Sequence, residues 1–125
     1  MPSHHALHYT EFPSRDLAVT QAFFTAVFGW TFTSYGEDYS AFVTGDREGG
    51  IYKSDCSFES KSGSPLLVFY STDLVASQRE IEAAGAQISE PIFRFPGGAR
   101  FHFIAPDSGE FAVWSDALQD ENETV

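Results

Sequence analysis

Apolar and polar positions follow two different periods along the chain, and these periods separate predicted helices from predicted strands. From Asp16 to Gly29 the apolar residues recur at the spacing of one helix face. Asp16 is a suitable N-cap, and Gly29 can adopt the left-handed conformation that ends a helix. Short runs rich in β-branched and aromatic residues, separated by Gly, Asp and Pro, are typical of strands. They predict strands at residues 8–12, 30–35, 39–44, 50–54, 66–70, 87–89, 99–104 and 110–114, with Pro13 ending the first of them.

This order of elements occurs twice. In each half a strand leads to an Asp-Leu pair, at Asp16 and again at Asp73, and the pair opens a helix. The second helix is capped by Thr72 or Asp73 and stops at Gly85, and three strands follow each helix. Such repetition indicates two copies of one βαβββ unit. One unit alone leaves a sheet face uncovered, so we expect an α+β fold in which two units pair in a mixed sheet curled around a central cavity.

The 125 residues match the length of a single domain, and 13 phenylalanines supply apolar surface for its core. We expect module 1 at about residues 7–54 and module 2 at about 66–115. A polar linker at about 55–65 separates them. Residues 116–125 form an acidic tail, which we expect to be a solvated chain end.

Net charge restricts the partners that the chain can have. Eighteen acidic residues against seven basic ones give a formal charge of −11. Nucleic acids and anionic membranes require a cationic surface, so we expect neither as a partner. The single cysteine excludes an internal disulfide, and the sequence shows no signal-like start and no apolar run long enough to span a membrane. These features favour a cytoplasmic location.

Two segments carry a resemblance to a known family. The first is Asp16-Leu17 with the run Ala22–Trp30, and the second is the turn Ala105–Glu110 before the last predicted strand. Both resemble segments of the vicinal oxygen chelate superfamily, which includes glyoxalase I, bleomycin resistance proteins and extradiol dioxygenases. The resemblance covers roughly residues 7–115. It implies paired βαβββ modules and a homodimer.

The resemblance fails at the metal site. Catalytic members of that family hold a divalent metal with one ligand from each of four strands. Here those positions correspond to Tyr9, Leu66, Ala112 and the segment Gly50–Tyr52, and none carries an imidazole or a carboxylate. Glu48 is close to the last of them but is placed in a turn. Since zinc and related ions need three or four N, O or S ligands, we expect no metal and no other cofactor, and the metal-dependent activities do not carry over.

Strand alternation identifies side chains that point toward the expected cavity. Arg100 can pair with a ligand carboxylate or phosphate. Glu11 and His102 are candidates for catalysis as a general acid and base. Alternation from Tyr9 and Ala112 places Glu11, Glu110 and Trp114 inward together with Tyr9. Spacing like that of the family, counted from Pro106, adds Arg100 and His102. Of these, the expected ligand-binding residues are Tyr9, Arg100, His102, Glu110 and Trp114.

Three functions are compatible with this set. The first is binding of a small organic ligand without a metal. The second is a lyase, isomerase or dioxygenase-type enzyme that uses Glu11–His102 acid–base catalysis or a misassigned metal site including Glu48, Glu11, His102 and Glu110. The third is a structural or partner-binding domain, in which the polar residues only hold the modules in register.

Three further features carry weaker hypotheses. His4 and His8 have the spacing of paired zinc ligands on a helix, but they precede a strand, so only adventitious metal is expected there. Residues 93–98 are predicted to form a loop that is either a lid or, as we favour, a plain connection. Cys56 has no neighbouring base in the sequence to activate it as a nucleophile.

Overall fold

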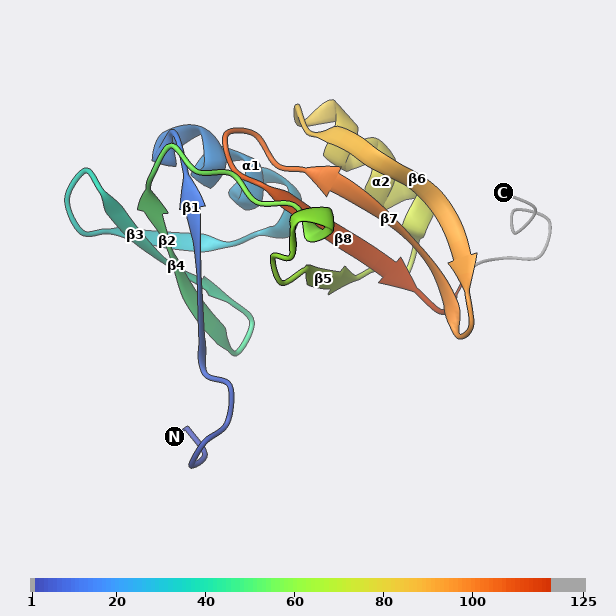
Figure 1. The fold of residues 1–125 in the computed structure, drawn as a ribbon, viewed down its shortest axis with the longest axis horizontal. Coiled ribbons are helices and arrows are strands. Elements are labelled where there is room, and N and C mark those ends of the chain that lie inside the picture. The colour runs from blue at the N-terminus through green and yellow to red at the C-terminus, as the bar shows by residue number, and fades with distance from the viewer. Residues whose placement is uncertain (1, 118–125) are drawn as a thin grey trace.

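The computed structural model describes residues 2–117, so the acidic residues Asp120, Glu121 and Glu123 of the expected tail lie outside the described part. Module 1 contains β1 (Tyr9–Ser14), α1 (Leu17–Phe28), β2 (Thr31–Ser34), β3 (Tyr39–Thr44) and β4 (Arg47–Lys53) (Figure 1). A short 3₁₀ helix (Ser60–Ser62) lies in the linker. Module 2 contains β5 (Leu67–Tyr70), α2 (Leu74–Ala83), β6 (Gln87–Phe95), β7 (Gly98–Ile104) and β8 (Glu110–Ser115). Within residues 2–117, no helix is long and apolar enough to cross a membrane.

The strands form two four-stranded sheets of the same topology. The order is β1-β4-β3-β2 in module 1 and β5-β8-β7-β6 in module 2. In each sheet the first strand runs parallel to its neighbour and the other pairs are antiparallel. The predicted α+β fold of two βαβββ modules is confirmed. The two sheets remain separate and do not close into one barrel.

The N-terminal ends of the two helices are built the same way. Asp16 accepts a hydrogen bond from the Val19 amide at 3.4 Å, and Asp73 accepts one from the Ala76 amide at 3.1 Å. Gly29 has a φ of 73°, the left-handed conformation expected at the end of α1. Two residues before each cap a serine hydroxyl accepts a hydrogen bond from the cap's own amide and pairs with a hydroxyl in the first helical turns. These hydroxyl pairs are Ser14–Thr20 at 2.7 Å and Ser71–Ser77 at 2.6 Å.

Strands β1, β4 and β6 extend beyond their predicted bounds, and β4 begins at Arg47 instead of residue 50. β1 continues through Pro13 to Ser14. Because β1 is at the edge of its sheet, Pro13 can lack an N–H without breaking an inner ladder. β6 extends to Phe95, so most of the expected loop at 93–98 is strand. Its register shifts on both sides of Glu90, next to Pro91, which disguises the strand in the sequence.

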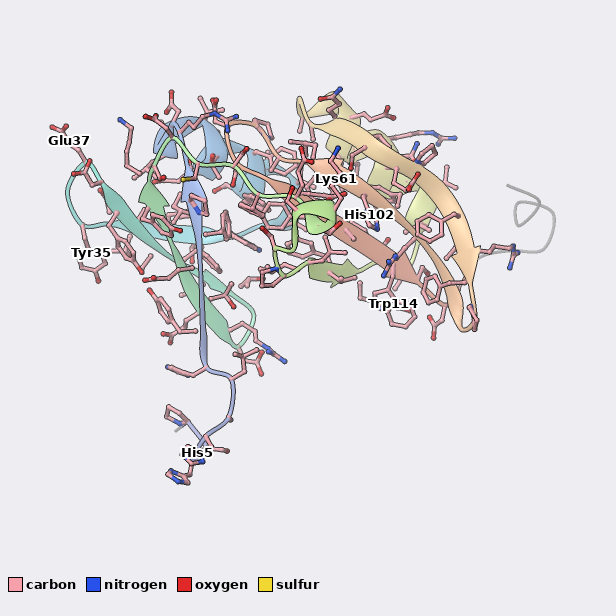
Figure 2. All side chains as sticks on the ribbon, viewed as in Figure 1. His5, Tyr35, Glu37, Lys61, His102 and Trp114 are labelled. Atoms are coloured by element: carbon pink, nitrogen blue, oxygen red, sulfur yellow. The ribbon has the colours of Figure 1, made fainter. Side chains whose placement is uncertain are left out.

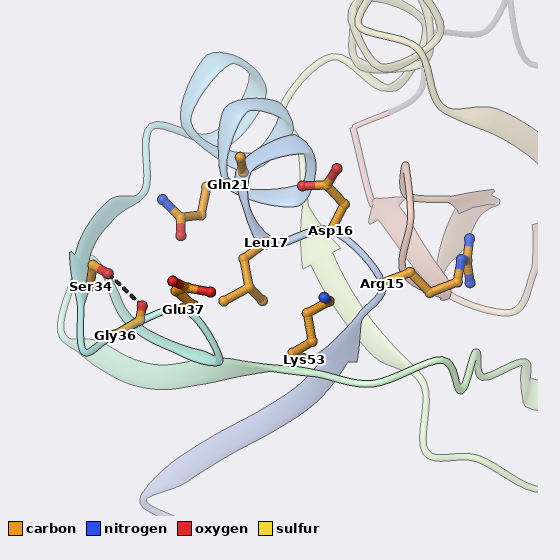
Figure 3. Close-up of a pocket in the computed structure, with 9 residues that line it drawn as sticks. Arg15, Asp16, Leu17, Gln21, Ser34, Gly36, Glu37 and Lys53 are labelled. Carbon is orange, nitrogen blue, oxygen red and sulfur yellow. Dashed lines mark hydrogen bonds between the residues drawn. The ribbon is translucent and has the colours of Figure 1, made fainter.

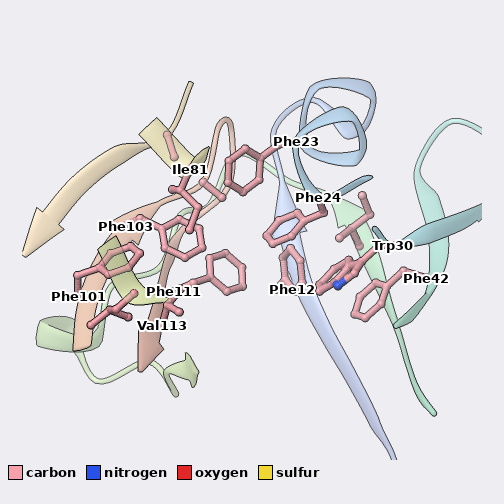
Figure 4. Close-up of a cluster of buried hydrophobic side chains, with 14 of the residues drawn as sticks. Phe12, Phe23, Phe24, Trp30, Phe42, Ile81, Phe101, Phe103, Phe111 and Val113 are labelled. Carbon is pink, nitrogen blue, oxygen red and sulfur yellow. The ribbon is translucent and has the colours of Figure 1, made fainter. Parts of the chain in front are cut away.

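An aromatic core connects the modules through α1 (Figure 4). Phe24 is fully buried, and its ring stacks on Trp30 of module 1 at 4.3 Å and meets the edge of Phe111 of module 2 at 5.2 Å. One helical turn later, Phe28 stacks on Phe69 of β5 at 4.2 Å. Helix α1 therefore belongs to the core of both modules.

We predict that Phe24→Ala destabilises the whole chain in one transition. Removing a fully buried ring with contacts in both modules should lower the free energy of unfolding by about 3–5 kcal/mol. Chemical denaturation followed by circular dichroism measures this loss. Val19→Ala, on the exposed side of the same helix, should change stability by less than about 0.5 kcal/mol. A loss below about 1 kcal/mol for Phe24→Ala would contradict the role given to this ring.

Candidate functional site

The sheet of module 2 presents polar side chains on the face opposite to the buried rings of Phe101, Phe103 and Phe111. Arg100 lies opposite Trp114 across β7 and β8, and His102 lies opposite Ala112, so these residues share one face. Phe101 and Phe103 of β7 are fully buried on the other face, as expected from strand alternation. Figure 2 shows His102 and Trp114 on this part of the sheet, with the 3₁₀ helix beside His102.

A buried carboxylate–imidazole pair forms the centre of this face. Oε2 of Glu110 lies 2.9 Å from Nδ1 of His102, and both side chains are only 10% exposed. The Ser60 amide and hydroxyl donate to Oε1 of Glu110 at 2.8 and 2.9 Å, and the Ser89 hydroxyl donates to Oε2 at 3.2 Å. The linker, through Ser60, thus fixes Glu110 in place, which the sequence did not reveal.

These hydrogen bonds decide the charge of Glu110. Burial alone would raise its pKa, but the donors from Ser60, His102 and Ser89 outweigh burial and lower the pKa to about 2. An ionised carboxylate only accepts hydrogen bonds, so Nδ1 of His102 is the donor. The other ring nitrogen, Nε2, is thereby left with a free lone pair in the neutral imidazole.

Two buried nitrogen atoms on β7 lack a hydrogen-bond partner among residues 2–117. They are Nε2 of His102 and Nε of Arg100, two residues apart on the same face. The Arg100 guanidinium lies 5.4 Å from the ring centroid of Phe93 and 5.7 Å from that of Phe95, both on β6. Aromatic faces, which attract a cation weakly, therefore hold its charged end. This leaves the guanidinium edge available for an anion.

The remaining predicted residues lie on module 1. Tyr39 donates a hydrogen bond to Oε2 of Glu11 at 2.8 Å, and its hydroxyl lies 2.7 Å from that of Tyr9. The side chain of Tyr39 crosses β4 at Gly50, where a Cβ would collide with the tyrosine hydroxyl. Burial, followed by the bonds with Tyr9 and Glu11, raises the pKa of Tyr39 above its ordinary value. Sequence reasoning missed Tyr39, although a glycine inside a strand signals such a close approach.

Glu11 and His102 have separate partners in this chain. Glu11 is bound to Tyr39 on the sheet of module 1, whereas His102 is bound to Glu110 on the sheet of module 2. No hydrogen bond joins Glu11 to His102 in the part of the chain that the structure describes. Their joint action in catalysis stays a prediction.

The donor set does not fit a metal ion. The implied positions hold Tyr9, Leu66, Ala112 and the stretch Gly50–Tyr52. Glu48, placed in a turn by sequence reasoning, instead lies in β4 directly opposite Tyr9. Even so, no group of three or more His, Cys, Asp or Glu side chains within residues 2–117 could hold an ion. A lone carboxylate beside a phenol is too few ligands for a divalent cation.

Cavities occur at several places on the described surface. One of about 460 Å³ lies where α1 begins, lined by Asp16, Glu37 and Lys53 among others (Figure 3). Asp16 already caps this helix end, and the two carboxylates oppose an anion there. A second of about 410 Å³ lies against Tyr9 and Tyr39. A third of about 540 Å³ lies between the modules.

The sequence matches one known protein family over nearly its whole length. A protein-family model described as the Glyoxalase/Bleomycin resistance protein/Dioxygenase superfamily matches residues 6–114. The chain belongs to this superfamily. No curated protein matches the sequence.

Solved structures of superfamily proteins share the fold at low identity. A mutant of the fosfomycin resistance protein from Listeria monocytogenes, complexed with Mn(II) and a dihydroxypropylphosphonic acid, has a TM-score of 0.74 and 20% identity, covering 97% of this chain and 96% of its own. A glyoxalase-related enzyme from Fulvimarina pelagi has a TM-score of 0.72 and 16% identity, with coverages of 90% and 88%. Lactoylglutathione lyase from Agrobacterium tumefaciens has a TM-score of 0.69 and 18% identity, with coverages of 94% and 98%. At these identities the likeness shows the fold alone.

We predict that Glu110→Gln removes a pH-dependent part of the stability. The pKa of Glu110 is lowered from 4.5 to about 2 on folding, so its contribution is present above pH 4.5 and is lost as the pH falls toward 2. At neutral pH the contribution should be on the order of 3 kcal/mol. Urea unfolding between neutral and acidic pH measures it. Glu82→Gln, at an exposed position of α2, is the matched control, and equal pH profiles for the two variants would contradict the assignment.

We also predict that Gly50→Ala displaces the Tyr39 side chain. The added methyl occupies the position of the tyrosine hydroxyl and separates it from Glu11. The pKa of Tyr39 should then fall toward the ordinary tyrosine value of about 10. Ultraviolet titration of the five tyrosines should therefore show one more group ionising in the ordinary range than in the unsubstituted chain. An unchanged titration curve would show that Tyr39 is not held as described.

Proposed function

We propose that this superfamily member binds a small organic anion, without a metal ion, on the open face of the module 2 sheet. The observation that carries the proposal is the buried N–H at Nε of Arg100 on β7, which has no partner among residues 2–117. Leaving a buried polar atom without a partner costs about 1–3 kcal/mol. A ligand with two acceptor oxygens would remove that cost by accepting hydrogen bonds from the edge of the Arg100 guanidinium, because guanidinium matches the geometry of carboxylates and phosphates.

Aromatic side chains around these atoms favour an aromatic ligand. Trp114 meets Tyr70 edge to face at 5.2 Å and lies 6.4 Å from Phe95, ring centre to ring centre. Phe93 lies 5.9 Å from the His102 ring. Rigid rings supply contact area at a low cost in conformational entropy. Small aromatic carboxylates and phosphates therefore combine both features of this face.

The proposal includes a homodimer. Each module leaves aromatic or aliphatic side chains exposed on its sheet, among them Tyr9 and Tyr52 on module 1 and Val68 and Tyr70 on module 2. The hydroxyl and carboxylate groups of module 1 are complementary in charge to Arg100 on module 2. A second copy of the chain packed over these two sheet faces would bury the exposed apolar side chains of each module. The formal charge of −11 argues against nucleic acids and anionic membranes as partners, and the single cysteine supports a reducing, cytoplasmic location.

Proton transfer by His102 is the second candidate function. Glu110 holds Nδ1 as the donor, so Nε2 is directed to act as a base without further rearrangement. The likeness in fold to a lactoylglutathione lyase supports a lyase or isomerase of this kind. This candidate needs a turnover that is lost in His102→Gln, whereas the binding function needs only affinity.

We predict that Arg100→Gln weakens binding of benzoate and phenyl phosphate at least tenfold, since each tenfold step is about 1.4 kcal/mol. Isothermal titration calorimetry measures the affinities. Arg79→Gln on the exposed surface of α2 removes the same charge and should leave both affinities unchanged. Equal affinities in Arg100→Gln and Arg79→Gln, or no saturable binding of either probe, would overturn the proposal.

A further inference from the structure

The cavity between the two modules forms a second ligand site, which we propose takes a flat, apolar molecule carrying a hydrogen-bond acceptor oxygen. Its volume of about 540 Å³ is within the range of small-molecule sites. Trp30 and Phe42 of module 1 line one side, and Leu67, Val68 and Phe69 of β5 line the other. Neither Arg100 nor His102 lines this cavity, and of its two walls only Val68 is also on the sheet face that carries them.

The indole N–H of Trp30 is the group in this cavity wall that lacks a hydrogen-bond acceptor among residues 2–117. Trp30 is 2% exposed, and its ring is stacked between Phe24 at 4.3 Å and Phe42 at 4.1 Å. Its indole N–H is buried and has no hydrogen-bond partner in the part of the chain that the structure describes. Figure 4 shows the indole nitrogen on the ring edge that faces away from α1. Buried tryptophan N–H groups ordinarily donate a hydrogen bond, so an oxygen atom of a bound molecule would supply what the protein does not.

The rest of the lining defines the body of the ligand. Phe42, Leu67 and Phe69 offer ring faces and aliphatic surface, which favours a flat apolar molecule. Arg47 and Glu48 lie at the exposed rim of the same cavity, where water can solvate their charges. The stacked rings on both sides of Trp30 restrict its rotation, so the donor has a fixed direction before any ligand binds.

Prodan, an apolar naphthalene with a carbonyl group, is a suitable probe. Titrated into the Trp114→Phe chain, it should quench the emission of Trp30, the remaining tryptophan, by energy transfer with single-site saturation. Dimethylaminonaphthalene keeps the rings but lacks the carbonyl, and should bind about tenfold more weakly because the indole N–H stays unpartnered. Trp30→Phe should remove this difference between the two probes.

A matched pair of substitutions tests the location. Val68 and Val43 are both strand residues of similar exposure, 44% and 47%, but only Val68 lines this cavity. Val68→Phe places a ring in the cavity and should weaken prodan binding at least fivefold, whereas Val43→Phe should leave it unchanged. Arg100→Gln should also leave prodan binding unchanged, which separates this site from the one proposed above.

Three results would overturn the proposal: equal prodan affinity in Val68→Phe and Val43→Phe, no energy transfer from Trp30, or no saturable binding. If Trp30→Phe or Trp114→Phe fails to fold, the unsubstituted chain still gives an answer. Its two tryptophans each give one indole N–H signal in ¹⁵N nuclear magnetic resonance. The Trp30 signal should shift downfield on prodan binding as its hydrogen bond forms, and an unshifted signal would contradict the site.

Discussion

The stacking of aromatic rings along one side of α1 is the interaction on which the rest of this structure depends. Phe24 contacts Trp30 in its own module and Phe111 in the other, and Phe28 continues the contact to Phe69. Offset and edge-to-face ring pairs add about 0.5–1.5 kcal/mol each to the burial of their apolar area. A single helix thereby fixes two sheets that share no backbone hydrogen-bond ladder. The direction in which each sheet presents its open face follows from these contacts.

The internal repeat sets the scaffold and leaves the chemistry free to differ. Ser14–Thr20 in module 1 and Ser71–Ser77 in module 2 are equivalent hydroxyl pairs, each beside an aspartate that caps a helix. The open faces have diverged on this common frame. Module 1 carries a chain of hydroxyl and carboxylate groups through Tyr39, whereas module 2 carries an imidazole and a guanidinium. A repeated fold with opposite polar character on its two halves favours ligands, or a second copy of the chain, that meet both.

The helices and strands could largely be predicted because they depend on neighbouring residues. The site could be predicted less well because its hydrogen bonds join residues far apart in the sequence. The caps Asp16 and Gly29 act within one helix, and the structure has both as expected. The predicted end of β1 was wrong. The energetic cost of Pro13 depends on whether its strand is at a sheet edge, and the local sequence pattern does not show this. The anchoring of Glu110 by Ser60 joins residues 50 positions apart, and no periodicity signals it. Sequence alternation could place side chains on a face, but it could not choose their partners.

The buried pair at the centre of module 2 explains why this face suits hydrogen bonding better than coordination. Four donor groups converge on Glu110 and keep it ionised, with its pKa at about 2. Its oxygens are therefore occupied, and only Nε2 of His102 is left among the ligating atoms of the pair. One imidazole nitrogen cannot hold a divalent ion. Next to this imidazole, however, the Arg100 guanidinium is held between two phenylalanine rings and keeps an N–H that is unpartnered within residues 2–117, a preorganised donor for an oxygen of a small anion.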